Sequence, residues 1–240
     1  MHTTRGHTWS LTIVAISIAT VVAALVFWDS PLLLPLKLFV VLLHEISHGL
    51  AALLTGGQVE QLVLTRDEGG LAFTRGGNRF LILSAGYLGS ALWGVVFMWL
   101  AWATPSIRRT ALRLTAIALA IVALLYVRNL FGLAYVVTAA LVLLALGRHG
   151  SARLQMAVLW LIGSFSCLYA VIDIGSDILL GGPLAGIPFL GGGAAASNDA
   201  ELLARITFIP AFLWGLLWSA IAIALYLFSV FTLALGRGRG

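Results

Sequence analysis

Charged residues are scarce in this sequence. They account for 10% of its 240 residues, whereas hydrophobic residues account for 61%. A soluble domain carries about a quarter charged residues and under half apolar ones, so this balance excludes an ordinary soluble globular protein. The apolar residues gather in blocks of roughly twenty, the length of helix needed to cross a hydrocarbon core about 30 Å thick. We therefore expect an all-α polytopic membrane protein.

Cysteine is nearly absent as well. The one cysteine, Cys167, lies inside an apolar block, which excludes an intrachain disulfide and a cysteine-rich metal site. The formal net charge is +5, but the basic residues lie mainly between apolar blocks, a pattern typical of loops on an anionic membrane face. We expect the lipid bilayer, and no nucleic acid, as a partner.

Seven apolar blocks follow one another along the chain, and we expect about six of them to be spans of a single domain, 1–240. The blocks lie at roughly 9–28, 36–55, 80–103, 110–127, 129–147, 153–180 and 206–235. As one helix, 110–147 would be about 55 Å long, so a break is expected at Arg128-Asn129. Basic residues agree with one cytoplasmic face only if one block between 80 and 147 is re-entrant. The orientation stays open within an integral multi-pass protein, which we expect in a bacterial cell membrane.

A short β-hairpin is predicted directly after the second block. Between Gln58 and Arg75, alternating and β-branched residues flank the turn sequence Asp67-Glu68-Gly69-Gly70. The preceding helix is expected to end at Gly56-Gly57, because glycine readily takes the conformation that ends a helix. The fold prediction is therefore a helical membrane protein with one hairpin behind its second helix.

The second block contains the pattern His-Glu-x-x-His at 44–48. Histidines four residues apart share one face of a helix, so His44 and His48 can bind the same tetrahedral zinc ion. Glu45 can take a proton from a water that the metal has made more acidic. Ionisable residues near a helix centre cost about 2.5–3.5 kcal/mol each on insertion scales, so three within five positions indicate a function. A proton relay or a polar packing network is the alternative.

Two histidines leave a zinc site one protein ligand short, because a catalytic zinc usually has three. The other carboxylates well inside an apolar block are Asp173 and Asp177, again four apart. One of them can complete the set while the other orients a ligand; Asp173 lies deeper in its block, and Asp177 is the alternative. Asp199 and Glu201, by contrast, are interpreted as the acidic first turn of the last helix rather than as ligands.

The sequence resembles the site-2 protease family of intramembrane zinc metalloproteases. The resemblance rests on the His-Glu-x-x-His pattern, Ala51-Ala52, Gly56-Gly57, the predicted hairpin, and the small residues of block 84–94. It covers roughly 36–180 and is closest to the compact branch without a PDZ domain. It implies Zn²⁺ as cofactor, a transmembrane protein substrate, and Asp173 as third ligand by its position on a later helix. Peptide-bond hydrolysis with Glu45 as base is the implied activity.

The sequence also departs from that family's pattern. Tyr87 follows Gly86 where proline is common, Ser90 stands near the usual asparagine, and Ile172-Asp173-Ile174-Gly175 replaces Leu-Asp-Gly. Three alternatives therefore stay open: a degenerate member that binds zinc without cutting, a transporter or proton relay, and a hydrolase of lipid-linked or small amides. Substrate identity and oligomeric state are not predicted.

Overall fold

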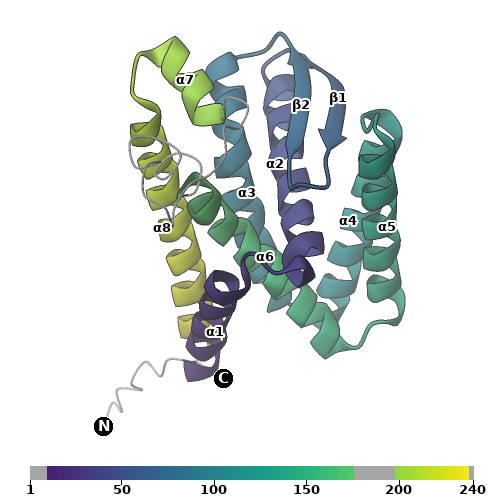
Figure 1. Cartoon of the computed structure of the whole chain (residues 1–240). Coiled ribbons are helices and arrows are strands. Elements are labelled where there is room, and N and C mark those ends of the chain that lie inside the picture. Colours follow the sequence, from purple (N-terminus) through teal and green to yellow (C-terminus); the bar gives the residue numbers. More distant parts are fainter. Residues whose placement is uncertain (1–9, 176–197, 238–240) are drawn as a thin grey trace.

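The chain folds as a helical bundle with one small sheet (Figure 1), here in a computed structural model that describes residues 10–175 and 198–237. Asp177 and the end of the predicted block 153–180 lie outside the described residues. The elements, in order, are α1 (Leu11–Phe27), the 3-10 helix η1 (Pro31–Leu33), α2 (Leu34–Leu54), β1 (Gln58–Leu64), β2 (Gly70–Arg75), α3 (Arg79–Ala101), α4 (Pro105–Leu125), α5 (Leu130–His149), α6 (Ala152–Ile174), α7 (Asp199–Thr207) and α8 (Ala211–Arg237).

Five of the described helices are long and apolar enough to cross a membrane. They are the helix from η1 through α2, and α3, α5, α6 and α8, while α1 is a shorter apolar helix. α4 is also long, but three arginines lie in its first half: Arg108, Arg109 and Arg113. The chain is therefore an all-α polytopic membrane protein, as predicted. The helix break between α4 and α5 falls at 126–129, where the length argument requires one.

The hairpin lies against α2 (Figure 1), as the turn sequence predicts. Gly56, with a φ of 81°, follows the end of α2, and β1 then runs back along the helix that it has just left. The strands pair antiparallel from Gln58↔Arg75 to Leu64↔Gly70, with a bulge between Val59 and Gln61. The hairpin therefore runs beside a membrane-spanning helix instead of extending away from it.

The two outer edges of the hairpin differ. Along β1, the Leu62 amide donates to the carbonyl of Tyr126 (2.8 Å), and the Asn129 side chain exchanges hydrogen bonds with the backbone of Leu64. The α4–α5 connection thus covers the edge of β1. Among the described residues, β2 pairs with no strand except β1, so its outer edge has no strand partner.

Small residues let α3 approach α2 and α6 closely. A Cβ added at Gly86 would lie 2.6 Å from Nε2 of His48, and one at Gly94 would lie 2.5 Å from Sγ of Cys167. Real Cβ atoms essentially never come within 3.0 Å of another heavy atom. The glycines of block 84–94 therefore set the spacing of the helices around the histidines.

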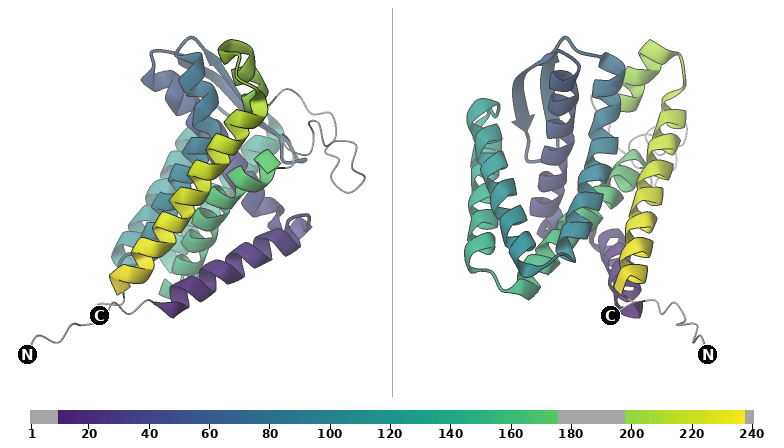
Figure 2. Two further views of the ribbon diagram at one scale, coloured as in Figure 1. Left: turned by 90° about the vertical axis from the view of Figure 1, so that its left-hand side faces the viewer. Right: turned by 180° about the vertical axis from the view of Figure 1, so that it is seen from behind.

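The last expected helix, from its acidic first turn through block 206–235, is divided in two. Asn198 caps a nine-residue helix, α7, by accepting a hydrogen bond from the Glu201 amide (2.9 Å). α7 ends at Phe208, whose φ of 61° is left-handed, and α8 begins three residues later. The acidic capped start that the sequence predicts is present, but it opens this short helix rather than the last one. α8 then runs beside α3 and α6 (Figure 2).

Candidate metal centre

α2 places His44 and His48 on one face, as their spacing predicts, and α7 brings Asp199 to them. Nε2 of each histidine lies 3.1 Å from Oδ2 of Asp199. The three ligand atoms all lie within 4.8 Å of one another. In a tetrahedral zinc site with bonds of about 2.0–2.1 Å, ligand atoms lie roughly 3.3 Å apart. Two imidazole nitrogens and one carboxylate oxygen are also a donor set that suits zinc.

A hydrogen bond on the opposite side of the His48 ring directs its Nε2 atom toward Asp199. Nδ1 of His48 lies 2.6 Å from the carbonyl oxygen of Ile82, at the start of α3. A carbonyl only accepts, so Nδ1 carries the proton and Nε2 keeps a lone pair when the ring is neutral. Nδ1 of His44 is buried and has no hydrogen-bond partner within the described ranges. His48 is thus oriented as a metal-binding histidine usually is.

Asp199 is a carboxylate in this site. Burial by itself would raise the pKa of its carboxyl group, but the charge of His48 and hydrogen bonds with both histidines lower that pKa below its usual value. The side chain is 14% exposed. A buried anion at the meeting point of two imidazole nitrogens favours a cation there. The residues present therefore fit a zinc ion.

Glu45 lies between the two histidines in sequence and faces the hairpin. Its residue is 5% exposed, and a backbone hydrogen bond from Ala72 reaches its carboxylate. A Cβ added at Gly70 would lie 2.5 Å from Oε1 of Glu45. β2 therefore passes close to Glu45, and only glycine fits at position 70.

Asp173, predicted from the sequence as third ligand, has another partner. Its Oδ2 accepts a hydrogen bond from the Tyr87 hydroxyl (2.8 Å). The Tyr87 ring lies edge-on to the ring of His44, with 4.7 Å between the centroids. The structure thus brings Asp173 near His44 through Tyr87, whereas Asp199 contacts both histidines directly. The ligand role of Asp173 stays a prediction.

One cavity of about 1050 Å³ joins these residues. Its lining includes His44, Glu45, His48, Asp173 and Asp199. The same cavity is lined by β2 from Gly70 to Thr74, and by Trp28 beyond the end of α1. Strand β2 and the candidate metal ligands therefore face a common space.

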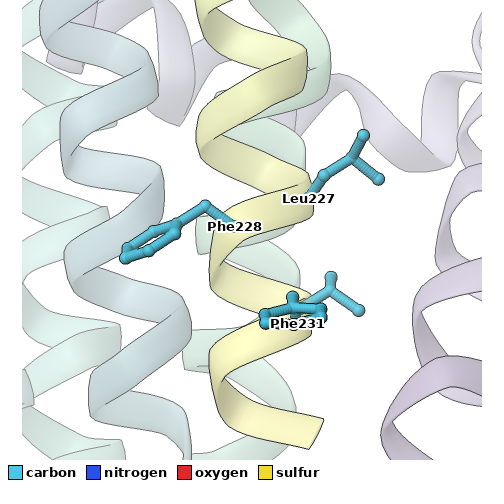
Figure 3. A pocket seen from close by; sticks show the side chains of 4 residues that line it. Leu227, Phe228 and Phe231 are labelled. Atoms are coloured by element: carbon cyan, nitrogen blue, oxygen red, sulfur yellow. The ribbon is translucent and has the colours of Figure 1, made fainter. Parts of the chain in front are cut away.

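A second hollow lies on α8 and has a different character. Leu227, Phe228, Val230 and Phe231 line it (Figure 3), and Phe228 packs near Trp99 with 6.2 Å between ring centroids. These four side chains are apolar and belong to a candidate membrane span. The hollow offers no group for catalysis or metal binding.

The contact of Asp199 with the histidines was not predicted, because the expected third ligands were carboxylates inside apolar blocks. α7 is short and polar at its start, so its acidic residues matched a helix cap. The signal that was available is the short supply of acids: the chain has nine aspartates and glutamates in all.

The sequence matches the family described as Peptidase M50B-like over residues 17–229. No curated protein matches the chain, and no solved structure does. The match covers most of the chain and includes the His-Glu-x-x-His helix, the hairpin, Asp173 and Asp199. The chain therefore belongs to the Peptidase M50B-like family, within the site-2 protease family of intramembrane metalloproteases.

Proposed function

We propose that this protein is a zinc endopeptidase that cuts peptide bonds of membrane-embedded protein substrates, acting as one transmembrane domain in a bacterial cell membrane. The observation that carries the proposal is the convergence of His44, His48 and Asp199 on one point beside Glu45. The cavity that they line is bordered by β2, whose outer edge pairs with no strand among the described residues. Family membership supports the same class of reaction.

His44, His48 and a carboxylate would hold the zinc. Contacts of 3.1 Å with both histidines favour Asp199. Asp173 is the alternative ligand, because it lines the same cavity. If Asp199 is the ligand, Asp173 acts through Tyr87, which packs against His44.

Zinc, when bound, polarises water and a substrate carbonyl and makes water acidic enough to attack near neutral pH. Glu45 is the base in this proposal: it accepts a proton from the attacking water and then passes it to the leaving amide nitrogen. Asp199, as a carboxylate, would offset part of the positive charge of an ion held by the two neutral imidazoles. The Ala72 contact keeps the Glu45 carboxylate directed toward β2, where the peptide would lie.

The edge of β2 is proposed to receive the substrate. The amides of a transmembrane helix are hydrogen-bonded within the helix, so a peptide bond is exposed only when the helix unwinds locally. An unwound segment can recover hydrogen bonds by pairing with a free strand edge. β2 offers that edge along the cavity wall, within reach of Glu45.

The test is cleavage by Glu45→Gln protein. Purified protein in liposomes would receive single transmembrane segments carrying a different tag at each end, and zinc would be measured by elemental analysis. We expect Glu45→Gln to keep about one zinc per chain and to lose cleavage. Glu60→Gln, an exposed glutamate of the same hairpin, is the matched control and should cut like wild type.

Two results would count against the proposal. Cleavage that survives in Glu45→Gln removes the assigned base. Wild-type protein that binds zinc but cuts none of the segments supports the alternative of a zinc-binding membrane protein without peptidase activity.

A further inference from the structure

The tip of the hairpin is joined to α2 by an ion pair. Nζ of Lys37 lies 2.5 Å from Oε1 of Glu68, and the two side chains are 5% and 32% exposed. The same ammonium lies 5.2 Å from the centre of the Trp28 ring. Lys37 is thus enclosed by a carboxylate from the hairpin turn and an aromatic ring from the end of α1.

This contact compensates for two unfavourable features. Lys37 is within a candidate membrane span, where an unpaired ammonium is costly because little water reaches it. Glu68 has a φ of 64°, in the left-handed region that residues other than glycine rarely adopt. Release of the hairpin tip would leave the lysine without its carboxylate, so the pair opposes movement of the tip.

The tip is directly connected to the proposed base. Glu68 precedes Gly70 by two residues, and a Cβ added at Gly70 would lie 2.5 Å from Oε1 of Glu45. Ala72, two residues further, supplies the backbone hydrogen bond to Glu45. A shift of the tip would therefore move the strand segment that contacts the base and faces the cavity.

We propose that the Lys37–Glu68 pair fixes the position of β2 against α2, so that both residues act as positioning residues for the peptidase reaction. Among the described residues, no hydrogen bond or ion pair joins Lys37 or Glu68 to the ligands or the base, so the effect passes through the backbone of β2. This inference rests on the proposed function for its kinetic consequence, but its structural consequence can be measured without any substrate.

Amide hydrogen exchange in lipid nanodiscs tests the structural part. In Glu68→Gln protein we expect amides of β1 and β2 to exchange about tenfold faster, since removal of one partner leaves the buried Lys37 ammonium without its carboxylate. The double variant Lys37→Met/Glu68→Gln has no unpaired charge but also lacks the link between the tip and α2, so its hairpin should still exchange faster than that of wild type. The exchange of α3 should stay unchanged. Glu60→Gln is the matched control, because it removes the same charge from the same hairpin outside this pair.

The charge-swapped variant Lys37→Glu/Glu68→Lys gives the second comparison. It restores an ion pair at the same place, so the amide hydrogen exchange rate of β1 and β2 should return toward the wild-type rate. In the cleavage assay with tagged segments, Glu68→Gln should lower kcat about tenfold while the protein keeps its full zinc content. The charge-swapped variant should recover part of that loss.

Hairpin exchange at the wild-type rate in both Glu68→Gln and the double variant would overturn the proposal. Failure of the peptidase proposal looks different: wild type would not cut, and the exchange measurements would still show whether the pair holds the hairpin.

Discussion

Asp173 and Asp199 line the same cavity, yet they come from contrasting regions. Asp173 is near the end of α6, a 23-residue apolar helix, and Asp199 opens α7, which has nine residues and a polar first turn. In sequence, the carboxylate inside the apolar helix is the conspicuous one. In space, Asp199 contacts both histidines, and Asp173 contacts Tyr87.

The difference shows that the role of an acidic residue depends on which helices pack around it. α7 packs against α3, and α3 also packs against α2 through its glycines. A short helix on the far side of α3 can therefore deliver its first residue to the histidines. A carboxylate in an apolar helix is unfavourable without a partner, but that partner need not be a metal ion. A tyrosine hydroxyl can also donate a hydrogen bond to it, as Tyr87 does to Asp173.

The largest effect is expected from neutralising these two carboxylates, one variant at a time. Asp199→Asn keeps the side-chain shape but removes the anion, and we expect at least about a 100-fold loss of zinc affinity, because changes at outer partners alone cost about 10–100-fold. Asp173→Asn should keep its zinc. Titration of zinc into metal-free protein measures both. Zinc lost in Asp173→Asn and kept in Asp199→Asn would reverse the comparison and restore Asp173 as the ligand.

Alanine substitutions at two glycines compare the packing beside the histidines with the packing beside Asp173. A Cβ at Gly86 would contact the histidines, whereas a Cβ at Gly175, two residues after Asp173, would meet none of the described residues within 4 Å. We expect Gly86→Ala to lower zinc affinity and cleavage about tenfold or more by displacing imidazoles from their positions, and Gly175→Ala to change neither.

Circular dichroism would show that both glycine variants remain helical. Normal zinc affinity in Gly86→Ala would mean that α3 leaves room for a methyl group beside the histidines.

The smallest effect is expected at Tyr87. Tyr87→Phe removes one hydrogen bond to Asp173 and keeps the ring against His44, so we expect kcat/KM to fall about threefold to tenfold with zinc retained. Steady-state kinetics beside Asp173→Asn sharpen the comparison. If Asp173 acts through Tyr87, the double variant should be no slower than Asp173→Asn alone; additive losses would indicate independent roles.

The membrane class, the hairpin and the histidine pair could be predicted because each depends on local sequence. Apolar length, a turn flanked by β-branched residues, and a spacing of four are read directly from neighbouring residues. The contact of Asp199 with His44 spans 155 positions, and no local pattern reports it. The division of the last block at Phe208 was also missed, because apolar residues continue on both sides of the left-handed turn.

The free edge of β2 has one more consequence. Unpaired backbone amides and carbonyls are not tolerated against lipid, so such an edge at membrane depth must face protein or water. The Lys37–Glu68 pair places the hairpin tip beside a candidate span, and the cavity along β2 is the space that its edge faces. Where its amides and carbonyls have no protein partner, this edge therefore requires water in the cavity while no peptide is bound. Hydrolysis consumes water, and the strand that is proposed to receive one reactant thus also retains the other beside Glu45.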